Sequence, residues 1–348
     1  MKWNKEIKIG ERLVGDGHPT YIIAEIGSNH NQSLELAYEN IDAAVLAGAD
    51  AVKFQSLKYD ELYEDKNSPD GIKELFKKIS LAEDWHEKLH NYSREKGVDF
   101  FSAPTYPNAV DILAKLEIDV LKIASPQFGF YPEILNRAIE YGKPLIMSTG
   151  LSNMAEIDGV LRICQKRNFF DIVLLHCVTQ YPTQPCNANL KVIDTYKRVF
   201  NCLVGYSDHT LGMHFATAAV VQGACVIEKH FTLDSTQDGP DHHFASEPGE
   251  FKHMVDAIRE LEVGIGTGVK AELTDWEKQH KKNIELKYVA KENVKPGQRL
   301  SNEMFDLKRG KSGIDVSFEE LILKTKLKKS ASLEKGDFLN WSMLEFLD

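Results

Sequence analysis

Polar side chains of the kinds used in catalysis occur at the ends of eight short apolar segments of this sequence. They are Glu25, Lys53, Gln55, Ser102, Lys122, Ser125, Ser148, His176, Ser207, His209, Glu228 and His230. Two lysines and several hydroxyls that converge on one place describe an anion site, with lysine as the point charge and serine as a donor to phosphate oxygens. A charge buried without a partner is costly, so each charged group needs a polar cavity or an ion pair. For any single charged residue among them, the alternative interpretation is a structural salt bridge at the rim of the fold rather than a functional role.

Two of these residues, His209 and His230, end adjacent segments, where their imidazoles could bind one divalent cation. Two histidines alone are a weak metal signal, and a hydrogen-bonded structural histidine is the alternative reading of either one. The turn-rich loop Gly239-Pro-Asp-His-His243 follows the last segment, and its Asp241 could reach the same place. We leave His242 and His243 of that loop outside the predicted metal site.

The segments that carry these residues alternate with stretches of helical periodicity. Strands are predicted at 21–26, 51–55, 99–102, 120–124, 145–148, 172–177, 203–207 and 226–230, and helices at 34–47, 83–95, 109–116, 132–139, 155–167, 190–199, 213–222 and 250–264. Eight strand–helix units are typical of a (β/α)8 barrel, whereas doubly wound sheets usually have about five or six strands. In barrels the catalytic residues lie at the C-terminal ends of the strands, which is where these polar groups fall.

Charge and the pattern of predicted elements divide the chain of 348 residues into two parts. We predict a TIM-barrel domain at 1–265, a linker at 266–284 and a small β-rich domain at 285–348. A module of that size is barely stable alone, so we expect it to dock on another surface.

Charge and hydropathy exclude several classes of partner. The net charge is −10, and residues 281–348 hold 14 Lys and Arg against 11 Asp and Glu, so the acidic charge lies in the first part. An acidic surface argues against nucleic acid as a partner. No apolar run approaches the length of a membrane span, the N-terminus lacks the apolar core of a secretory signal, and five cysteines form no CxxC pair. We therefore expect a cytoplasmic protein without a membrane segment.

Nine motifs in a fixed order give the chain a specific resemblance. They are AEIGSNHN (24–31), AVKFQ (51–55), FFSAP (100–104), LKIAS (121–125), STG (148–150), LLHC…YPT (174–183), GYSDHT (205–210), EKHFT (228–232) and GPDHH (239–243). Together they resemble the N-acetylneuraminate (sialic acid) synthase family, which includes legionaminic and pseudaminic acid synthases. The segment VKPGQRLSNEMFDLKRGKSGI (294–314) is similar to the antifreeze-like (SAF, β-clip) domain of that family.

The resemblance implies condensation of phosphoenolpyruvate with an open-chain N-acylated amino sugar, such as N-acetylmannosamine or a 2,4-diacetamido-6-deoxyhexose, to give a nonulosonic acid and phosphate. It also implies a divalent metal, Mn²⁺ or Mg²⁺, and a domain-swapped homodimer. Glu25 and Lys53 are the implied catalytic residues, and His209 and His230 the metal ligands. The implied phosphoenolpyruvate contacts are Lys53, Lys122, Ser125, Ser148, Thr179 and Ser207, and the sugar contacts are Gln55, Gln127, Tyr181, Asp241 and Arg309.

Departures from the family pattern affect the sugar site most. Ser102-Ala103-Pro104 replaces the common Ser-Thr-Pro, so a hydroxyl contact is lost or moves to Ser102 or Thr105. Ser125-Pro126-Gln127 replaces the Ser-Gly-Glu of sialic acid enzymes, so an amide stands where a carboxylate would contact the sugar. Two alternatives remain. An octulosonate or heptulosonate synthase would show arginines for a second phosphate, and a non-catalytic sugar-binding barrel would gain little from Glu25 and a histidine pair.

Overall fold

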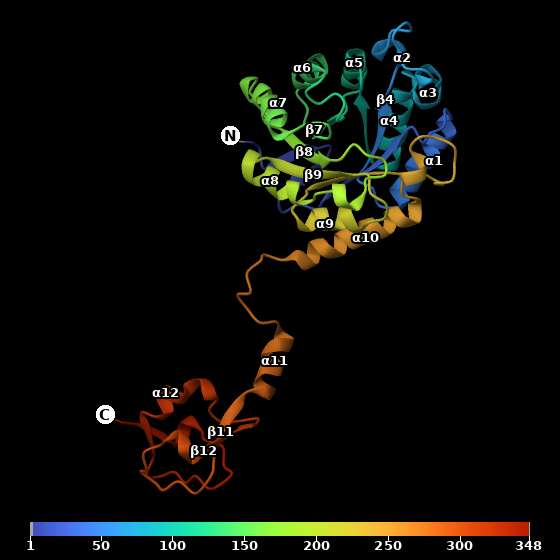
Figure 1. The fold of residues 1–348 in the computed structure, drawn as a ribbon. Coiled ribbons are helices and arrows are strands. Elements are labelled where there is room, and N and C mark those ends of the chain that lie inside the picture. Colours follow the sequence, from blue (N-terminus) through green and yellow to red (C-terminus); the bar gives the residue numbers. More distant parts are fainter. Residues whose placement is uncertain (1–2, 348) are drawn as a thin grey trace. The chain divides into compact units, whose positions relative to one another are not determined.

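The computed structural model describes residues 3–347 and divides into two compact units, the first ending at Gly266 and the second beginning at Thr267. Figure 1 shows the first unit as a ring of helices around a sheet. We describe each unit by itself.

The first unit is built around a parallel sheet of eight strands. The strands are β3 (Tyr21–Gly27), β4 (Ala51–Ser56), β5 (Asp99–Pro104), β6 (Leu121–Ile123), β7 (Leu145–Ser148), β8 (Ile172–Cys177), β9 (Leu203–Asp208) and β10 (Val226–His230). Their hydrogen-bonded order is β5-β4-β3-β10-β9-β8-β7-β6, and β5 also contacts β6, so the sheet is a nearly closed barrel. The predicted (β/α)8 fold is confirmed.

Helices follow the strands and cover the outside of the barrel (Figure 1). They are α1 (Leu34–Leu46), α4 (Trp85–Lys96), α5 (Pro107–Lys115), α6 (Pro132–Tyr141), α7 (Met154–Lys166), α8 (Lys191–Phe200), α9 (His214–Val221) and α10 (Pro248–Ile265). Local sequence signals fix their ends. Ser33 accepts a hydrogen bond from the Leu36 N–H at the start of α1, and Gly97 ends α4 in the left-handed conformation.

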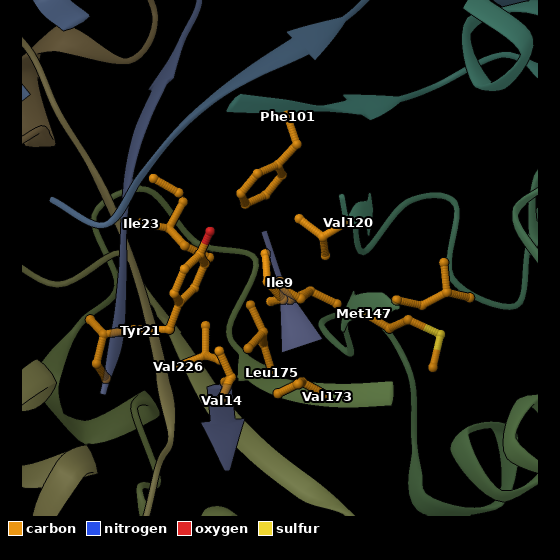
Figure 2. Close-up of a cluster of buried hydrophobic side chains, with 14 of the residues drawn as sticks. Ile9, Val14, Tyr21, Ile23, Phe101, Val120, Met147, Val173, Leu175 and Val226 are labelled. Carbon is orange, nitrogen blue, oxygen red and sulfur yellow. The ribbon is translucent and has the colours of Figure 1, made fainter. Parts of the chain in front are cut away.

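An N-terminal hairpin closes the bottom of the barrel and was not predicted. It consists of β1 (Glu6–Ile9) and β2 (Arg12–Gly15), paired antiparallel. Figure 2 shows Ile9 and Val14 of the hairpin among barrel side chains such as Tyr21 and Val226. On the polar side of the hairpin, Arg12 forms ion pairs with Asp50 at 3.4 Å and with Asp99 at 3.1 Å. Asp50 directly precedes β4, and Asp99 is the first residue of β5.

Two short helices lie between β4 and α4, in a segment that the sequence left without a predicted structure. They are α2 (Tyr59–Leu62) and α3 (Ile72–Ile79). An aromatic cluster joins them, because the Tyr63 ring lies 5.7 Å from that of Tyr59 and 5.6 Å from that of Phe76. This insertion lies at the same end of β4 as Lys53 and Gln55.

The second unit has its own small core. Its elements are α11 (Asp275–Ile284), β11 (Leu286–Ala290), β12 (Phe305–Arg309), α12 (Glu319–Ile322), β13 (Thr325–Leu327) and β14 (Leu344–Phe346). Leu300, Ile314 and Leu339 are among its buried residues. Helix α11 lies in the segment predicted as a linker, where Thr274 and Glu277 form a reciprocal capping box that begins the helix.

Short 3₁₀ turns complete the two units, at Pro185–Asn187, His242–Phe244, Asn302–Met304, Val316–Phe318 and Trp341–Met343. Within the described chain no helix has both the length and the apolar composition needed to cross a bilayer.

Candidate active site

A cavity of about 420 Å³ opens at the C-terminal ends of the barrel strands. Most of the residues singled out from the sequence line it. Its polar lining includes Glu25, Lys53, Gln55, Thr105, Lys122, Ser125, Gln127, Ser148, Tyr181, Ser207, His209, Glu228 and His230. The strand ends that the sequence marked as reactive therefore meet in one place.

Strand alternation explains how the barrel brings these groups together. Side chains two residues apart on a strand point to the same face, so Tyr21 and Ile23 enter the apolar interior and Glu25 follows at the cavity. On β10 the same alternation takes Val226 to Glu228 and then to His230. Figure 2 shows Tyr21, Ile23 and Val226 within a cluster of buried apolar side chains. The neighbouring ladders pair Glu25 with His230 on one side and with Lys53 on the other.

Glu25 lies at the centre of the charged lining. Its Oε2 is 2.6 Å from Nζ of Lys53, and its Oε1 accepts a hydrogen bond of 2.6 Å from Nε2 of Gln55. The ladder between β3 and β4 shifts register between Glu25 and Gly27, where the backbone of Gly27 is left-handed. A Cβ at Gly27 would approach Glu25 Oε1 and Asp241 Oδ2 to 3.1 Å each, so a glycine at this position lets the acidic groups gather.

Glu228 is a second buried carboxylate of the cavity, which the sequence analysis placed at a strand end without assigning it a role. Its oxygens lie 3.7 Å from Nζ of Lys53 and 3.8 Å from Nζ of Lys122, and it accepts a hydrogen bond of 3.0 Å from Oγ of Ser207. The sequence carried a signal for it, since Glu228 stands two residues before His230 on one strand and must share its face.

The two carboxylates have opposite electrostatic environments. Burial raises the pKa of Glu25, an effect that Lys53 and Gln55 only partly oppose. Burial also acts on Glu228, but the ammonium groups of Lys122 and Lys53 outweigh it and hold its pKa below the usual value. Lys53 follows the same logic, because Glu228 and Glu25 together overcome the effect of burial and raise its pKa. Glu228 is therefore a fixed anion, whereas Glu25 is poised to exchange a proton.

His209 and His230 face each other, with ring centroids 5.4 Å apart. Burial lowers the pKa of both imidazoles, so both are neutral near pH 7. Nδ1 of His209 lies 2.8 Å from the Val178 carbonyl, which fixes the proton on that nitrogen. Nε2 is then unprotonated, and it lies 3.4 Å from Oγ of Ser207, which also donates to Glu228. In the described part of the chain, Nδ1 of His230 has no hydrogen-bond partner. A metal-binding group of three or more His, Cys, Asp or Glu side chains does not occur between residues 3 and 347.

Lys122 and several hydroxyls complete the lining of the cavity. Nζ of Lys122 donates to Oγ of Ser148 at 2.6 Å, and burial lowers the pKa of this lysine. Ser125 accepts a hydrogen bond of 3.1 Å from the Gly150 N–H. Ser102, one of two residues considered for a displaced hydroxyl contact, instead bonds Ser56 at 2.8 Å outside the cavity, and only Thr105 lines the cavity.

The remaining predicted residues are placed differently. Tyr181 lines the cavity with its ring 4.3 Å from that of His209, and Gln127 lines it with an Oε1 that is buried and unpaired within residues 3–347. Asp241 accepts a hydrogen bond of 3.0 Å from Ser28 and lies beside Gly27 rather than in the cavity lining. Thr179 lines a neighbouring cavity next to Gly150. Arg309 lies exposed at the end of β12 in the second unit.

A parallel barrel whose strand ends enclose two buried carboxylates, two lysines and several hydroxyls has the architecture of the (β/α)8 barrel enzymes. Residues 40–270 match the NeuB family. A protein of Methanocaldococcus jannaschii described as uncharacterized is 41% identical over 98% of this chain and 99% of its own length. The N,N'-diacetyllegionaminic acid synthase of Campylobacter jejuni is 37% identical over 87% of this chain and 94% of its own.

A solved structure agrees with these relatives. The N-acetylneuraminic acid (sialic acid) synthetase of Leptospira borgpetersenii superposes with a TM-score of 0.73 at 32% identity, and the match covers 80% of this chain and 95% of that one. The chain belongs to the NeuB family and is an enzyme of the sialic-acid-type synthase class.

Proposed function

We propose that this enzyme condenses phosphoenolpyruvate with an open-chain N-acylated amino sugar to give a nonulosonic acid and inorganic phosphate. One observation carries the proposal: Glu25, Lys53, Glu228 and Lys122 meet at the strand ends, and only one of the two carboxylates has a raised pKa. Two carboxylates whose pKa values are pushed apart identify the acid/base group and the fixed charge of a site.

Phosphoenolpyruvate fits the half of the cavity around Lys122. Lys53 and Lys122 supply positive charge, and Ser125, Ser148 and Ser207 supply donors for carboxylate and phosphate oxygens. Thr179 lines the neighbouring cavity. Its position therefore does not support the expectation that it contacts phosphoenolpyruvate.

A divalent cation, Mn²⁺ or Mg²⁺, fits the pair of histidines. Both imidazoles are neutral, the His209 tautomer leaves Nε2 for a cation, and Nδ1 of His230 is a buried nitrogen without a partner among the described residues. His209 and His230 would hold the cation, with water and substrate oxygens as the other ligands. When bound, a cation supplies Lewis acidity that polarises the aldehyde oxygen of the sugar.

Glu25 acts after the methylene carbon of phosphoenolpyruvate attacks the aldehyde carbon. The enol carbon becomes electron-poor, and the carboxylate of Glu25 stabilises it. Water then adds to this carbon while Glu25 takes one water proton, which passes on to the oxygen of the former aldehyde. The bond between this carbon and the phosphate oxygen breaks as the new hydroxyl becomes the ketone, and phosphate leaves with the proton of that hydroxyl. Lys53, 2.6 Å from Glu25, holds the carboxylate in place during both steps.

The sugar occupies the outer part of the cavity in this proposal. Gln55, Gln127 and Tyr181 line the cavity, and Asp241 Oδ2 and Glu25 Oε1 both lie beside Gly27. We further propose that the second unit is a SAF domain that covers the cavity of a partner in a domain-swapped homodimer and presents Arg309 to the sugar. The exposure of Arg309 supports this role, since a guanidinium used in another subunit must be free in its own.

The decisive experiment measures phosphate release from phosphoenolpyruvate with Mn²⁺ and a series of N-acylated amino sugars, with mass spectrometry of the product. We expect a product that combines the carbons of both substrates. Glu25→Gln should lower turnover by roughly 10² to 10⁴, the usual contribution of a general acid/base, while calorimetry still detects phosphoenolpyruvate binding.

Glu39→Gln is the matched control, because Glu39 is an exposed carboxylate on α1, and it should keep wild-type turnover. If Glu25→Gln retained most of its turnover, the acid/base assignment would be wrong. Phosphate release with none of the sugars would contradict the proposed reaction.

A further inference from the structure

A buried ion pair lies between the ends of β9 and β10 and plays no part in the chemistry proposed above. Nζ of Lys229 is 2.8 Å from Oδ2 of Asp208, and the two residues are 2% and 1% exposed. They are direct neighbours in the ladder between the two strands. Both lie outside the cavity lining, yet each is next in sequence to one of the two histidines.

Strand alternation places this pair on the side of the strands away from the cavity. On β10, Lys229 stands between Glu228 and His230, which both line the cavity, so its side chain points to the opposite face. Asp208 ends β9 and directly precedes His209, which also lines the cavity. The ion pair therefore joins, from outside the cavity, the two strand ends that carry the histidine pair.

Further hydrogen bonds connect the ion pair to the backbone around His209. Oδ1 of Asp208 accepts hydrogen bonds from the N–H of Thr210 at 2.9 Å and from its Oγ1 at 2.8 Å. Nζ of Lys229 also donates to the carbonyl of Thr210 at 2.8 Å. Lys229 thus bonds both the residue before His209 and the residue after it, so the backbone of this histidine is tied to the strand that carries His230.

The two imidazoles differ in how else they are held. His209 has a hydrogen bond of its own, from Nδ1 to the Val178 carbonyl at 2.8 Å. Nδ1 of His230 has no partner among the described residues, so this ring is held by its strand and by packing against Phe244, 4.7 Å between centroids. The separation of the two imidazoles therefore depends on how the ends of β9 and β10 are held together.

The energetics of a buried ion pair favour a geometric role over a role in stability. Loss of water from both charges offsets most of the attraction between them, and apolar side chains of similar volume often stabilise a fold equally well. Apolar side chains cannot supply the directional bonds that Lys229, Asp208 and Thr210 form here. The main contribution of the ion pair is therefore the relative position of two strand ends.

We propose that Lys229 and Asp208 are positioning residues, which hold His209 and His230 at the separation needed to bind one divalent cation. This inference rests on the proposed function, which assigns a cation to the histidine pair. Residues that orient metal ligands without touching the metal typically contribute about 10- to 100-fold to metal affinity. Lys229 and Asp208 act through the backbone of the two histidines rather than through their rings.

The Kd for Mn²⁺, measured with the full-length protein by electron paramagnetic resonance of the free ion, tests this role. A single substitution would leave one charge buried without a partner and destabilise the fold. The double variant Asp208→Asn with Lys229→Met removes both charges, and the asparagine Oδ1 can still accept from Thr210. We expect it to fold and its Kd for Mn²⁺ to rise by about 10- to 100-fold. An unchanged Kd overturns the inference and leaves the proposed function standing.

Arg259→Met is the matched control. Arg259 bonds Oδ2 of Asp50 and the carbonyl of Thr20, each at 2.8 Å, and these residues directly precede β4 and β3 at the opposite end of the barrel. This substitution should lower the midpoint of urea unfolding while the Kd for Mn²⁺ stays at the wild-type value. An equal rise of the Kd in this control would mean that any loss of stability weakens the site, which also overturns the inference.

If the double variant proves insoluble, Thr210→Val provides the test, because it removes the hydrogen bond from Oγ1 to Asp208 and keeps the shape of the side chain. Its Kd for Mn²⁺ should rise by about threefold, since one hydrogen bond is lost. An unchanged Kd again overturns the inference. A wild-type enzyme that binds no Mn²⁺ contradicts the cation of the proposed function itself, and the inference with it.

Discussion

At the scale of residues, identical side chains have different properties because their neighbours differ. Glu25 and Glu228 are both buried glutamates, yet burial dominates the first and raises its pKa, whereas two ammonium groups lower the pKa of the second. The hydrogen bond from Gln55 is one of the few contacts that stabilise the ionised form of Glu25.

Removal of that hydrogen bond tests the assignment of Glu25 as the base. In Gln55→Ala the ionised carboxylate loses a donor at 2.6 Å, so the pKa of Glu25 rises further. A base must be ionised to accept a proton, and the acidic limb of the kcat/KM profile should therefore move to higher pH. Gln222→Ala, at an exposed glutamine, should leave the profile unchanged. A limb that stays in place would show that another group sets it.

Most charged residues of the cavity could be predicted from the sequence because strand ends of a barrel converge. Glu25, Lys53, Lys122, His209 and His230 all fall there. Glu228 was named among the strand-end residues but was given no role, because its environment depends on two lysines that are far away in sequence and near only in the fold. Ser102 shows the opposite case, since its side chain faces Ser56 rather than the cavity, which its position in the sequence did not reveal.

At the scale of elements, the N-terminal hairpin stabilises the barrel from below without touching the cavity. Ile9 is fully buried in the floor, whereas Leu13 of the same hairpin is 44% exposed. Ile9→Ala should lower the free energy of unfolding by about 2–5 kcal/mol, the range for a large buried side chain. Leu13→Ala should change it by no more than about 0.5 kcal/mol. Urea denaturation measures both, and an equal effect of the two substitutions would contradict the role of the hairpin as a floor.

The elements differ in how well the sequence predicts them. The eight barrel strands are short runs rich in β-branched residues between clear helix boundaries, so their positions were found within a few residues. The hairpin at Glu6–Gly15 was missed because its two strands are only four residues each and gain their stability from the barrel above. Helix α11 was missed because none of its residues is buried, so it has no apolar stripe, and its signal lies in the capping box of Thr274 and Glu277.

At the scale of the whole molecule, the two units each have a hydrophobic core of their own. A chain that ends at Gly266 should therefore fold, with a far-ultraviolet circular dichroism spectrum of a barrel and a cooperative thermal transition. Its turnover should fall sharply, because the proposed cover of the cavity and Arg309 are both removed. The full-length Arg309→Ala variant separates the loss of the guanidinium from the loss of the cover. A truncated protein with full activity would contradict the capping role.

The charge balance of the cavity has a consequence for ligand binding. Two buried carboxylates already neutralise Lys53 and Lys122. The negative charge of an incoming anion therefore exceeds the positive charge of these four groups. Glu25 has to stay ionised to act as the base, so the phosphate group of the bound ligand, whose second pKa is about 6 in water, is the group that can take up a proton. Binding of phosphoenolpyruvate should therefore draw a proton from solution. Calorimetry in buffers of different ionisation enthalpy would register that proton as a buffer-dependent heat, and Glu25→Gln, which removes one negative charge from the site, should reduce it.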